Sequence, residues 1–242
     1  MAADRSLAGI FVTGTDTGVG KTLVAAALAR FLTGRGLRVG VMKPVETGVF
    51  DPARPGPDAE LLRWAAGGTL AEELLAPYRF RLPLAPAVAA EKEGQAIEPS
   101  RLLDAMGEVA RDHDYIIVEG AGGLMVPLVG GYLIADLVRE STLPLLTICR
   151  PSLGTINHTL LTLFAARTME IPLAGYLINN LSAEPDAAAE ASPHALASLA
   201  SADLLGVLPE VFGTPEAKVE ALVGHLARLP TLPWLMAGLG LP

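Results

Sequence analysis

The most informative segment of the sequence is Gly14-Thr15-Asp16-Thr17-Gly18-Val19-Gly20-Lys21-Thr22, or GTDTGVGKT. The apolar run Leu7–Thr13 predicts a strand before it, and Lys21–Gly34 predicts a helix after it. Glycines let the backbone turn tightly and point its N–H groups inward, while the helix N-terminus adds positive potential beside Lys21. The Thr22 hydroxyl is placed to ligate Mg²⁺. This order predicts a phosphate loop, one residue longer than the usual G-x-x-x-x-G-K-[ST] spacing.

Apolar strands alternate with helical segments along the rest of the chain. Pro99–Asp112 predicts a second helix. Further strands are predicted at Leu37–Lys43, Tyr115–Glu119, Leu143–Cys149, Leu173–Asn179 and Leu204–Leu208. Apolar strands separated by helices form parallel sheets covered on both faces. We therefore predict one domain over residues 1–242, an α/β fold of the P-loop NTPase type with a doubly wound, mostly parallel sheet and helices on both faces.

Two segments are predicted to be loops, and the C-terminal tail is predicted to be ordered. Val49–Pro57 is rich in proline and lies between a strand and a helix. Leu181–Pro193 is rich in Ala, Glu and Pro and is predicted to be a mobile loop. The tail after Pro230 is apolar, so we expect it to pack on the body of the protein.

Composition and charge exclude several classes of protein. The net charge of -8 argues against a general binder of nucleic acid or of membrane surfaces, since either needs a basic face. Cys149 is the only cysteine, so an intrachain disulfide is impossible and a reducing compartment is expected. The first residues do not read as a signal peptide, and no apolar run is long enough to span a membrane. These features predict a cytoplasmic protein.

Two acidic residues are candidates for the metal site that a phosphate loop requires. Glu119 ends the strand YIIVE and is followed by Gly120-Ala121-Gly122, a position typical of the acid that accompanies a phosphate loop. Asp58 follows the proline-rich loop and is a second candidate. Mg²⁺ usually takes one or two carboxylates together with phosphates and water. The other interpretation of Asp58 is that of a helix N-cap, and the residues alone favour it.

Lys43 ends the second predicted strand, in the segment Lys43-Pro44-Val45-Glu46-Thr47-Gly48. The carboxyl ends of parallel strands face the ligand crevice, so Lys43 is expected to point at the transferred phosphoryl group or its acceptor. A solvated lysine at a strand end is the alternative.

Four blocks together resemble the dethiobiotin synthetase family. They are GTDTGVGKT at Gly14–Thr22, KPVETG at Lys43–Gly48, VEGAGG at Val118–Gly123 and LGTINHTLLT at Leu153–Thr162. Asn179, in GYLINN, resembles the residue that reads adenine in that family. The resemblance implies an ATP- and Mg²⁺-dependent ligase of biotin biosynthesis. Its reaction takes 7,8-diaminononanoate and CO₂ (or bicarbonate) to dethiobiotin through a carbamate and a carbamic-phosphoric anhydride.

The resemblance also implies a role for each matching position. The implied metal ligands are Thr22, Asp58 and Glu119. The implied catalytic residues are Lys21, Lys43, Thr17 and Thr47. The implied ATP contacts are Gly14, Thr15, Asp16, Thr17, Gly18, Val19, Gly20, Lys21, Thr22, Asp58, Glu119, Gly120, Ala121, Gly122, Asn179 and Pro209. The implied substrate contacts are Lys43, Thr47, Gly154, Thr155, Ile156 and Asn157.

The family further implies a homodimer in which the loop Gly154–Asn157 of one subunit holds the substrate carboxylate of the other. Two positions depart from the family: Gly18 stands where some relatives carry an acid, so the role of that acid is not transferred, and Asn180 stands where some relatives have Asp, which leaves the strictness of adenine choice open. Two alternatives share the loop style, namely a regulatory ATPase like ParA or MinD and a relative of corrin-type amidoligases. The first would carry a lysine where Asp16 stands, and the second normally needs a further glutaminase domain.

Overall fold

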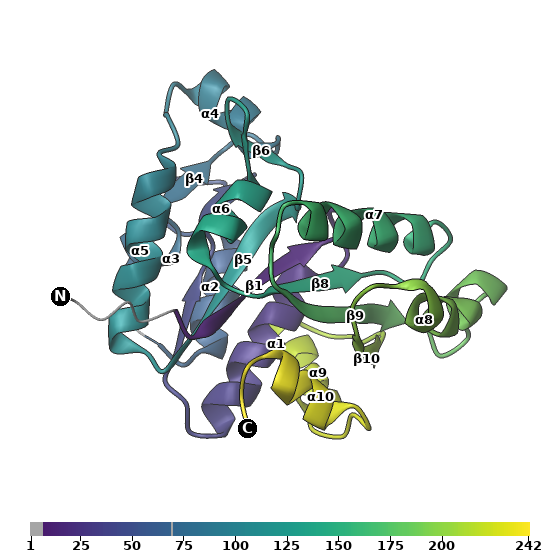
Figure 1. Cartoon of the computed structure of the whole chain (residues 1–242). Coiled ribbons are helices and arrows are strands. Elements are labelled where there is room, and N and C mark those ends of the chain that lie inside the picture. Colours follow the sequence, from purple (N-terminus) through teal and green to yellow (C-terminus); the bar gives the residue numbers. More distant parts are fainter. Residues whose placement is uncertain (1–6, 69) are drawn as a thin grey trace.

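The computed structural model describes residues 7–68 and 70–242. A six-stranded sheet in the order β10-β9-β8-β1-β5-β2 crosses the molecule (Figure 1), and every neighbouring pair in it is parallel. Its strands are β1 (Gly9–Gly14), β2 (Val39–Met42), β5 (Tyr115–Gly123), β8 (Leu145–Cys149), β9 (Leu173–Leu181) and β10 (Leu204–Pro209). Two small sheets pair β3 (Val45–Thr47) with β4 (Tyr78–Phe80), and β6 (Pro127–Val129) with β7 (Tyr132–Leu133).

Helices cover both faces of the main sheet. One face carries α1 (Lys21–Gly34), α2 (Pro57–Ala65), α9 (Pro215–Leu226) and α10 (Leu232–Gly238). The other carries α5 (Pro99–Asp112), α6 (Ile134–Ser141), α7 (Thr155–Thr168) and α8 (Ala187–Leu199). Helix α4 (Pro86–Glu93) packs against the small-sheet strands β3, β4 and β6. The short helix α3 (Glu72–Leu75) precedes β4. Among the described residues, no helix has the length and apolar character needed to cross a membrane.

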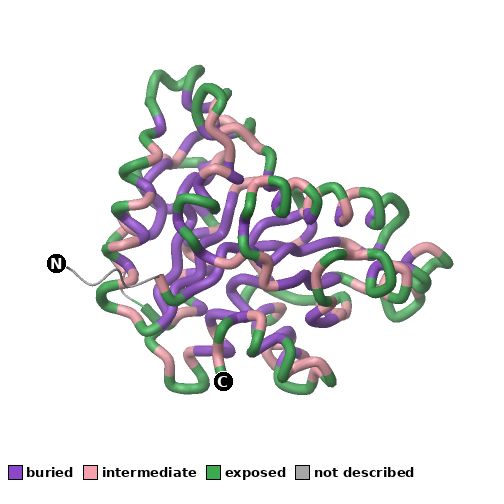
Figure 2. Tube along the Cα trace, in the orientation of Figure 1, coloured by how far each residue is buried: buried purple, intermediate pink, exposed green. Residues whose placement is uncertain are grey.

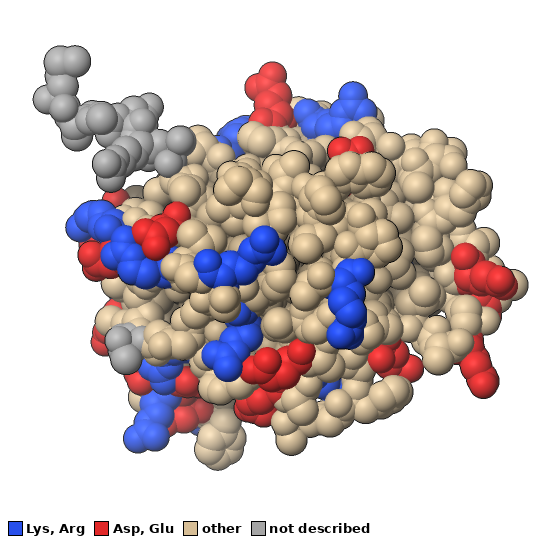
Figure 3. Space-filling view, turned by 90° about the horizontal axis from the view of Figure 1, so that it is seen from below, with Lys and Arg blue, Asp and Glu red and all other residues tan. Residues whose placement is uncertain are grey.

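Successive side chains along each strand point to opposite faces of the sheet, so a hydrophobic core forms on each face. In β1, Ile10 and Val12 point into the core beneath α1, whereas Phe11 points into the core on the opposite face. All three are fully buried, because both faces of a central parallel strand are covered. Figure 2 shows this buried interior running along the sheet. The face drawn in Figure 3 carries acidic and basic side chains interspersed.

The predicted fold class is confirmed by this architecture. Helices α1 and α5 have the predicted bounds, and the predicted strands all form with small shifts at their ends. Strand β5 runs on to Gly123, so Glu119 lies inside the strand and does not end it as predicted. The apolar tail packs as predicted, since Leu235 and Leu239 are buried and Tyr115 donates a hydrogen bond to the Leu239 carbonyl.

The prediction of a mobile loop at Leu181–Pro193 was wrong, because most of this segment belongs to α8. Alanine has the highest helix propensity, and Asp186 caps the helix by accepting the Ala189 N–H at 2.8 Å. Pro193 cannot donate to the carbonyl of Ala189, and the Ser192 hydroxyl donates to that carbonyl at 3.2 Å. A local side chain therefore satisfies the acceptor that proline leaves free.

Candidate active site

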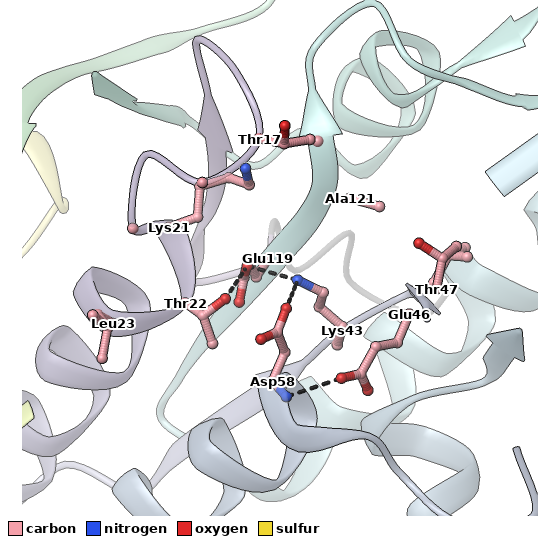
Figure 4. Close-up of a pocket in the computed structure, with 14 residues that line it drawn as sticks. Thr17, Lys21, Thr22, Leu23, Lys43, Glu46, Thr47, Asp58, Glu119 and Ala121 are labelled. Carbon is pink, nitrogen blue, oxygen red and sulfur yellow. Dashed lines mark hydrogen bonds and ion pairs between the residues drawn. The ribbon is translucent and has the colours of Figure 1, made fainter. Parts of the chain in front are cut away.

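A cavity of about 390 Å³ lies at the carboxyl edge of the sheet and joins three of the four predicted blocks. Its lining contains Thr17, Gly18, Gly20, Lys21, Thr22, Leu23, Lys43, Val45, Glu46, Thr47, Asp58, Glu119, Ala121 and Gly122. Figure 4 shows that these side chains come from the phosphate loop, from the end of β2 and from β3, α2 and β5. The structure thus brings together all the residues for which the sequence predicted catalytic or metal-binding roles.

The phosphate loop is held in its shape by left-handed glycines and by a distant side chain. Gly18 and Gly20 have φ of 71° and 88°, values that L side chains rarely adopt. A Cβ on Gly20 would overlap the side-chain amide of Asn179, so the loop leaves no room for one. Lys21 is 7% exposed, and its Nζ donates to the Asp16 carbonyl at 2.9 Å. Burial, the largest influence, lowers the pKa of Lys21.

Lys43 is the centre of a buried charge cluster. Its Nζ lies 2.7 Å from Glu119 Oε1 and 2.9 Å from Asp58 Oδ2. Burial opposes its charge most strongly, but the attraction of Glu119 and Asp58 prevails and raises the pKa of Lys43. Since Lys43 is 4% exposed, the alternative of a solvated lysine is wrong. The cluster keeps a buried cation at the strand end.

The oxygen atoms around Glu119 have the chemistry that a hard divalent cation prefers. Glu119 is 0% exposed, and its Oε1 accepts from the Thr22 hydroxyl at 2.8 Å as well as from Lys43. Its second oxygen, Oε2, is buried and has no hydrogen-bond partner among the described residues. A buried carboxylate oxygen without a partner is unfavourable. Thr22, Asp58 and this free oxygen of Glu119 therefore fit a magnesium ion.

Asp58 does not cap its helix, so the N-cap interpretation is wrong. The N-cap of α2 is Gly56, and Asp58 stands two residues later with its carboxylate turned to Lys43. The cap comes from Glu46, whose carboxylate accepts the N–H groups of Gly56 and Asp58, each at 2.9 Å. Glu46 is 3% exposed, and burial is the main cause that raises its pKa. The sequence analysis missed Glu46, because nothing local in KPVETG points to a helix start ten residues away.

Asn179 lies two residues before the end of β9, and Pro209 is the last residue of the adjacent strand β10. The Asn179 side chain is buried, and its Nδ2 donates to the Val19 carbonyl of the phosphate loop at 3.0 Å. An amide nitrogen carries two hydrogens and the amide oxygen is a separate acceptor. Asn179 can therefore hold the phosphate loop and still offer a donor and an acceptor to a base.

The segment Gly154–Asn157 does not line the cavity of its own chain. Gly154 is the N-cap of α7, with φ of 94°. Thr155 is 2% exposed and its N–H donates to Ser152, so the side chain points into the protein, whereas Asn157 is exposed. A second cavity, of about 400 Å³, separates α7 from the outer side of the phosphate loop and is lined by Asp16, Met125, His158 and Leu161 among others.

Buried Cys149 takes no part in either cavity. Its Sγ donates to the Leu177 carbonyl at 3.2 Å, and burial raises the pKa of the thiol to about 12. A thiol in such surroundings is protonated and unreactive. This agrees with the sequence-based interpretation of a small core residue.

Comparisons with known proteins agree with the fold. A family model described as an AAA domain matches residues 8–215. The MinC:MinD cell division protein complex of Aquifex aeolicus superposes with a TM-score of 0.56 at 15% identity, covering 96% of this chain and 93% of that one. A ParA family ATPase from Chlorobium tepidum TLS gives a TM-score of 0.54 at 17% identity, covering 96% of this chain and 99% of that one. Identities this low establish a shared fold only.

The fold and the site together define a phosphate-loop nucleotide-binding protein. The ATP-dependent dethiobiotin synthetase BioD of Bacillus subtilis (strain 168) is 38% identical over 219 residues, which cover 90% of this chain and 94% of that protein. The protein of the same name from Anaeromyxobacter dehalogenans (strain 2CP-C) is 43% identical over 201 residues, covering 83% and 89%. The chain belongs to the dethiobiotin synthetase family, as the four sequence blocks predicted.

Proposed function

We propose that this chain closes the ureido ring of dethiobiotin from 7,8-diaminononanoate, CO₂ and ATP. The observation that carries the proposal is the meeting of Lys21, Lys43 and two carboxylates in one cavity at the end of a phosphate-loop strand. Phosphoryl transfer depends mostly on positioning and on charge stabilisation, and these groups supply both. Family membership supplies the substrate class.

The reaction needs three bond-forming steps. One amine of the substrate attacks CO₂ and loses a proton, which gives a carbamate. A carbamate oxygen then attacks the γ-phosphorus of ATP, and ADP leaves. The second amine attacks the carbonyl carbon of the mixed anhydride, which closes the ring and expels phosphate. Lys21 and Lys43 stabilise negative charge on the γ-phosphoryl and carbamate oxygens, while Thr17 in the phosphate loop and Thr47 on β3 supply hydroxyl donors to the cavity.

A magnesium ion fits the oxygen set of Thr22, Asp58 and Glu119, and we include it in the proposal. When bound, it neutralises charge on the β- and γ-phosphates. The two carboxylates are already held close to each other through Lys43, which lies within 2.9 Å of both.

Steady phosphate release that requires both diamino acid and bicarbonate tests the function. We expect release from ATP only with both co-substrates present, together with one dethiobiotin per phosphate. A regulatory ATPase of the ParA or MinD type would release phosphate without them, and an amidoligase would require a nitrogen donor such as glutamine. Either pattern would contradict the proposal.

Asn179→Ala is expected to narrow the preference for ATP over GTP by roughly tenfold, the value of one or two hydrogen bonds to the base edge. Because Asn179 also holds the Val19 carbonyl, the Michaelis constant for ATP alone does not isolate the effect on base choice. The ratio of kcat/KM for ATP to that for GTP is the right measurement, since loosening of the phosphate loop affects both nucleotides alike.

The neighbouring Asn180 provides the control for base choice. It is exposed and has φ of 70°, so Asn180→Gly keeps the backbone conformation while removing the side chain. This variant should retain the selectivity of the unaltered protein. If Asn179→Ala keeps the same preference for ATP over GTP as Asn180→Gly, the base is recognised by other residues.

We further propose a homodimer that shares its active sites. Large apolar side chains are exposed along α7 and beside it: Leu153 (86%), Ile156 (36%), Leu161 (57%), Phe164 (68%) and Met125 (54%). A set of exposed apolar side chains of this size is typical of a protein–protein interface. The N-terminus of α7 lies outside the cavity of its own chain, yet free N–H groups at a helix N-terminus favour an anion. These features support binding of the substrate carboxylate by the backbone N–H groups of Ile156 and Asn157 of the other subunit.

A further inference from the structure

Glu46 is a buried carboxylate to which neither the family resemblance nor the proposed reaction gives a role. It lies on β3 between Val45 and Thr47, is 3% exposed, and makes no ion pair of 4.0 Å or less with any described cation. Burial of a carboxylate is unfavourable unless hydrogen bonds replace its water. For Glu46 the replacement comes from two backbone N–H groups, those of Gly56 and Asp58, at 2.9 Å each.

These two N–H groups belong to the start of α2, which has no cap of its own. The N-cap, Gly56, has no side chain, and Pro57 has no N–H to donate. A carboxylate at a helix N-terminus satisfies the open donors and interacts favourably with the helix dipole. Gly56 cannot be replaced easily, since a Cβ there would lie 2.6 Å from Glu46 Cδ. The first turn of α2 and the side chain of Glu46 are therefore fitted to one another.

The first turn of α2 matters because it carries Asp58. The backbone N–H of Asp58 donates to Glu46 Oε1, while its carboxylate reaches Lys43 Nζ at 2.9 Å (Figure 4). Asp58 is the most exposed member of the charge cluster, with 44% of its side chain accessible, whereas the Glu119 side chain is fully buried. Glu119 is enclosed and bonded to both Lys43 and Thr22, whereas the Asp58 carboxylate is held by Lys43 and by the helix backbone that carries it.

We propose that Glu46 is a positioning residue that fixes the Asp58 carboxylate in the metal site by holding the first turn of α2. Thr47, which lines the cavity, follows Glu46 directly on β3. The same strand therefore links the position of the Asp58 carboxylate to that of Thr47. The inference deepens the proposed function and rests on its assignment of Asp58 as a magnesium ligand.

The test measures magnesium binding without turnover. The protein is saturated with ADP, and its melting temperature is followed as Mg²⁺ is added. For Glu46→Ala the Mg²⁺ concentration at half of the full shift should rise roughly tenfold or more, as is usual when outer residues of a metal site are lost. Glu46→Gln keeps the volume of the side chain but only one acceptor oxygen, so it should raise this Mg²⁺ concentration less. If the alanine variant does not fold, the glutamine variant takes its place.

Glu93→Ala is the matched control, because the Glu93 carboxylate also accepts two backbone N–H groups, those of Arg81 and Leu82, away from the cavity. Its magnesium midpoint should not change. A double variant completes the design: if Glu46 acts through Asp58, then Glu46→Ala should add nothing to the shift caused by Asp58→Ala.

The outcomes separate this inference from the proposed function. If Asp58→Ala shifts the midpoint but Glu46→Ala and Glu46→Gln do not, Asp58 remains a ligand and the positioning role of Glu46 is refuted. Additive shifts in the double variant, or an equal shift in Glu93→Ala, refute it as well. An unshifted Asp58→Ala overturns the metal role of Asp58 itself, and with it the inference.

Discussion

Lys43→Met is expected to reduce turnover about a thousandfold or more, the effect of removing a preorganised charge from a phosphoryl-transfer site. It should also lower the free energy of unfolding by about 3 kcal/mol, because the carboxylate of Glu119 would stay buried without its cation. Glu119 is 0% exposed and would keep only the Thr22 hydroxyl as a partner. Phosphate release and urea unfolding in the absence of nucleotide measure the two effects.

A second substitution separates the two consequences of losing Lys43. Glu119→Gln in the Lys43→Met background removes the unpaired charge, so most of the lost stability should return while turnover stays lost. The exposed pair of Arg30 and Glu220, 2.9 Å apart, gives a control, and Glu220→Ala should cost less than about 1 kcal/mol. If Lys43→Met is as stable as the unaltered protein, the charge cluster does not contribute to folding as described.

Mixing two inactive variants should restore activity if the active sites are shared between subunits. Lys21→Ala removes the phosphate-loop cation. Asn157→Asp places a carboxylate in the first turn of α7, where it is favourable for the helix but competes with the substrate carboxylate for the same N–H groups. Asn157 is preferred to Thr155 for this purpose, because Thr155 is buried and a charge there would disturb the fold.

Each heterodimer would contain one site with an intact phosphate loop and an intact partner helix. Random exchange makes half of the dimers mixed, so activity should recover to about a quarter of that of the unaltered protein. Phosphate release before and after mixing is the measurement, and labelled subunits confirm exchange. Asn157→Ala, which adds no charge, is the control and should lose much less activity. A mixture that exchanges but stays inactive would refute the shared site.

Elements whose cause is local could be predicted from the sequence. The glycines of GTDTGVGKT fix the phosphate loop, because a left-handed backbone is open to few other residues, and φ at Gly18 and Gly20 is positive as that requires. The buried strands could also be predicted from runs of apolar residues, because the pattern of burial along a strand depends on residues that are neighbours in the sequence. Short blocks in a fixed order were also sufficient to identify the family.

The partners of the site's side chains follow from the fold and from no local pattern. Thr22 and Lys43 reach Glu119 across 97 and 76 residues of chain, because β5 lies between β1 and β2 in the sheet. The capping of α2 by Glu46 and the hold of Asn179 on Val19 likewise join segments that are distant in the sequence. Sequence periodicity records whether a residue faces the interior, but partners in the interior are set by strand order and by packing. For that reason the sequence placed Asp58 at the start of a helix, and only the fold turned its carboxylate toward Lys43.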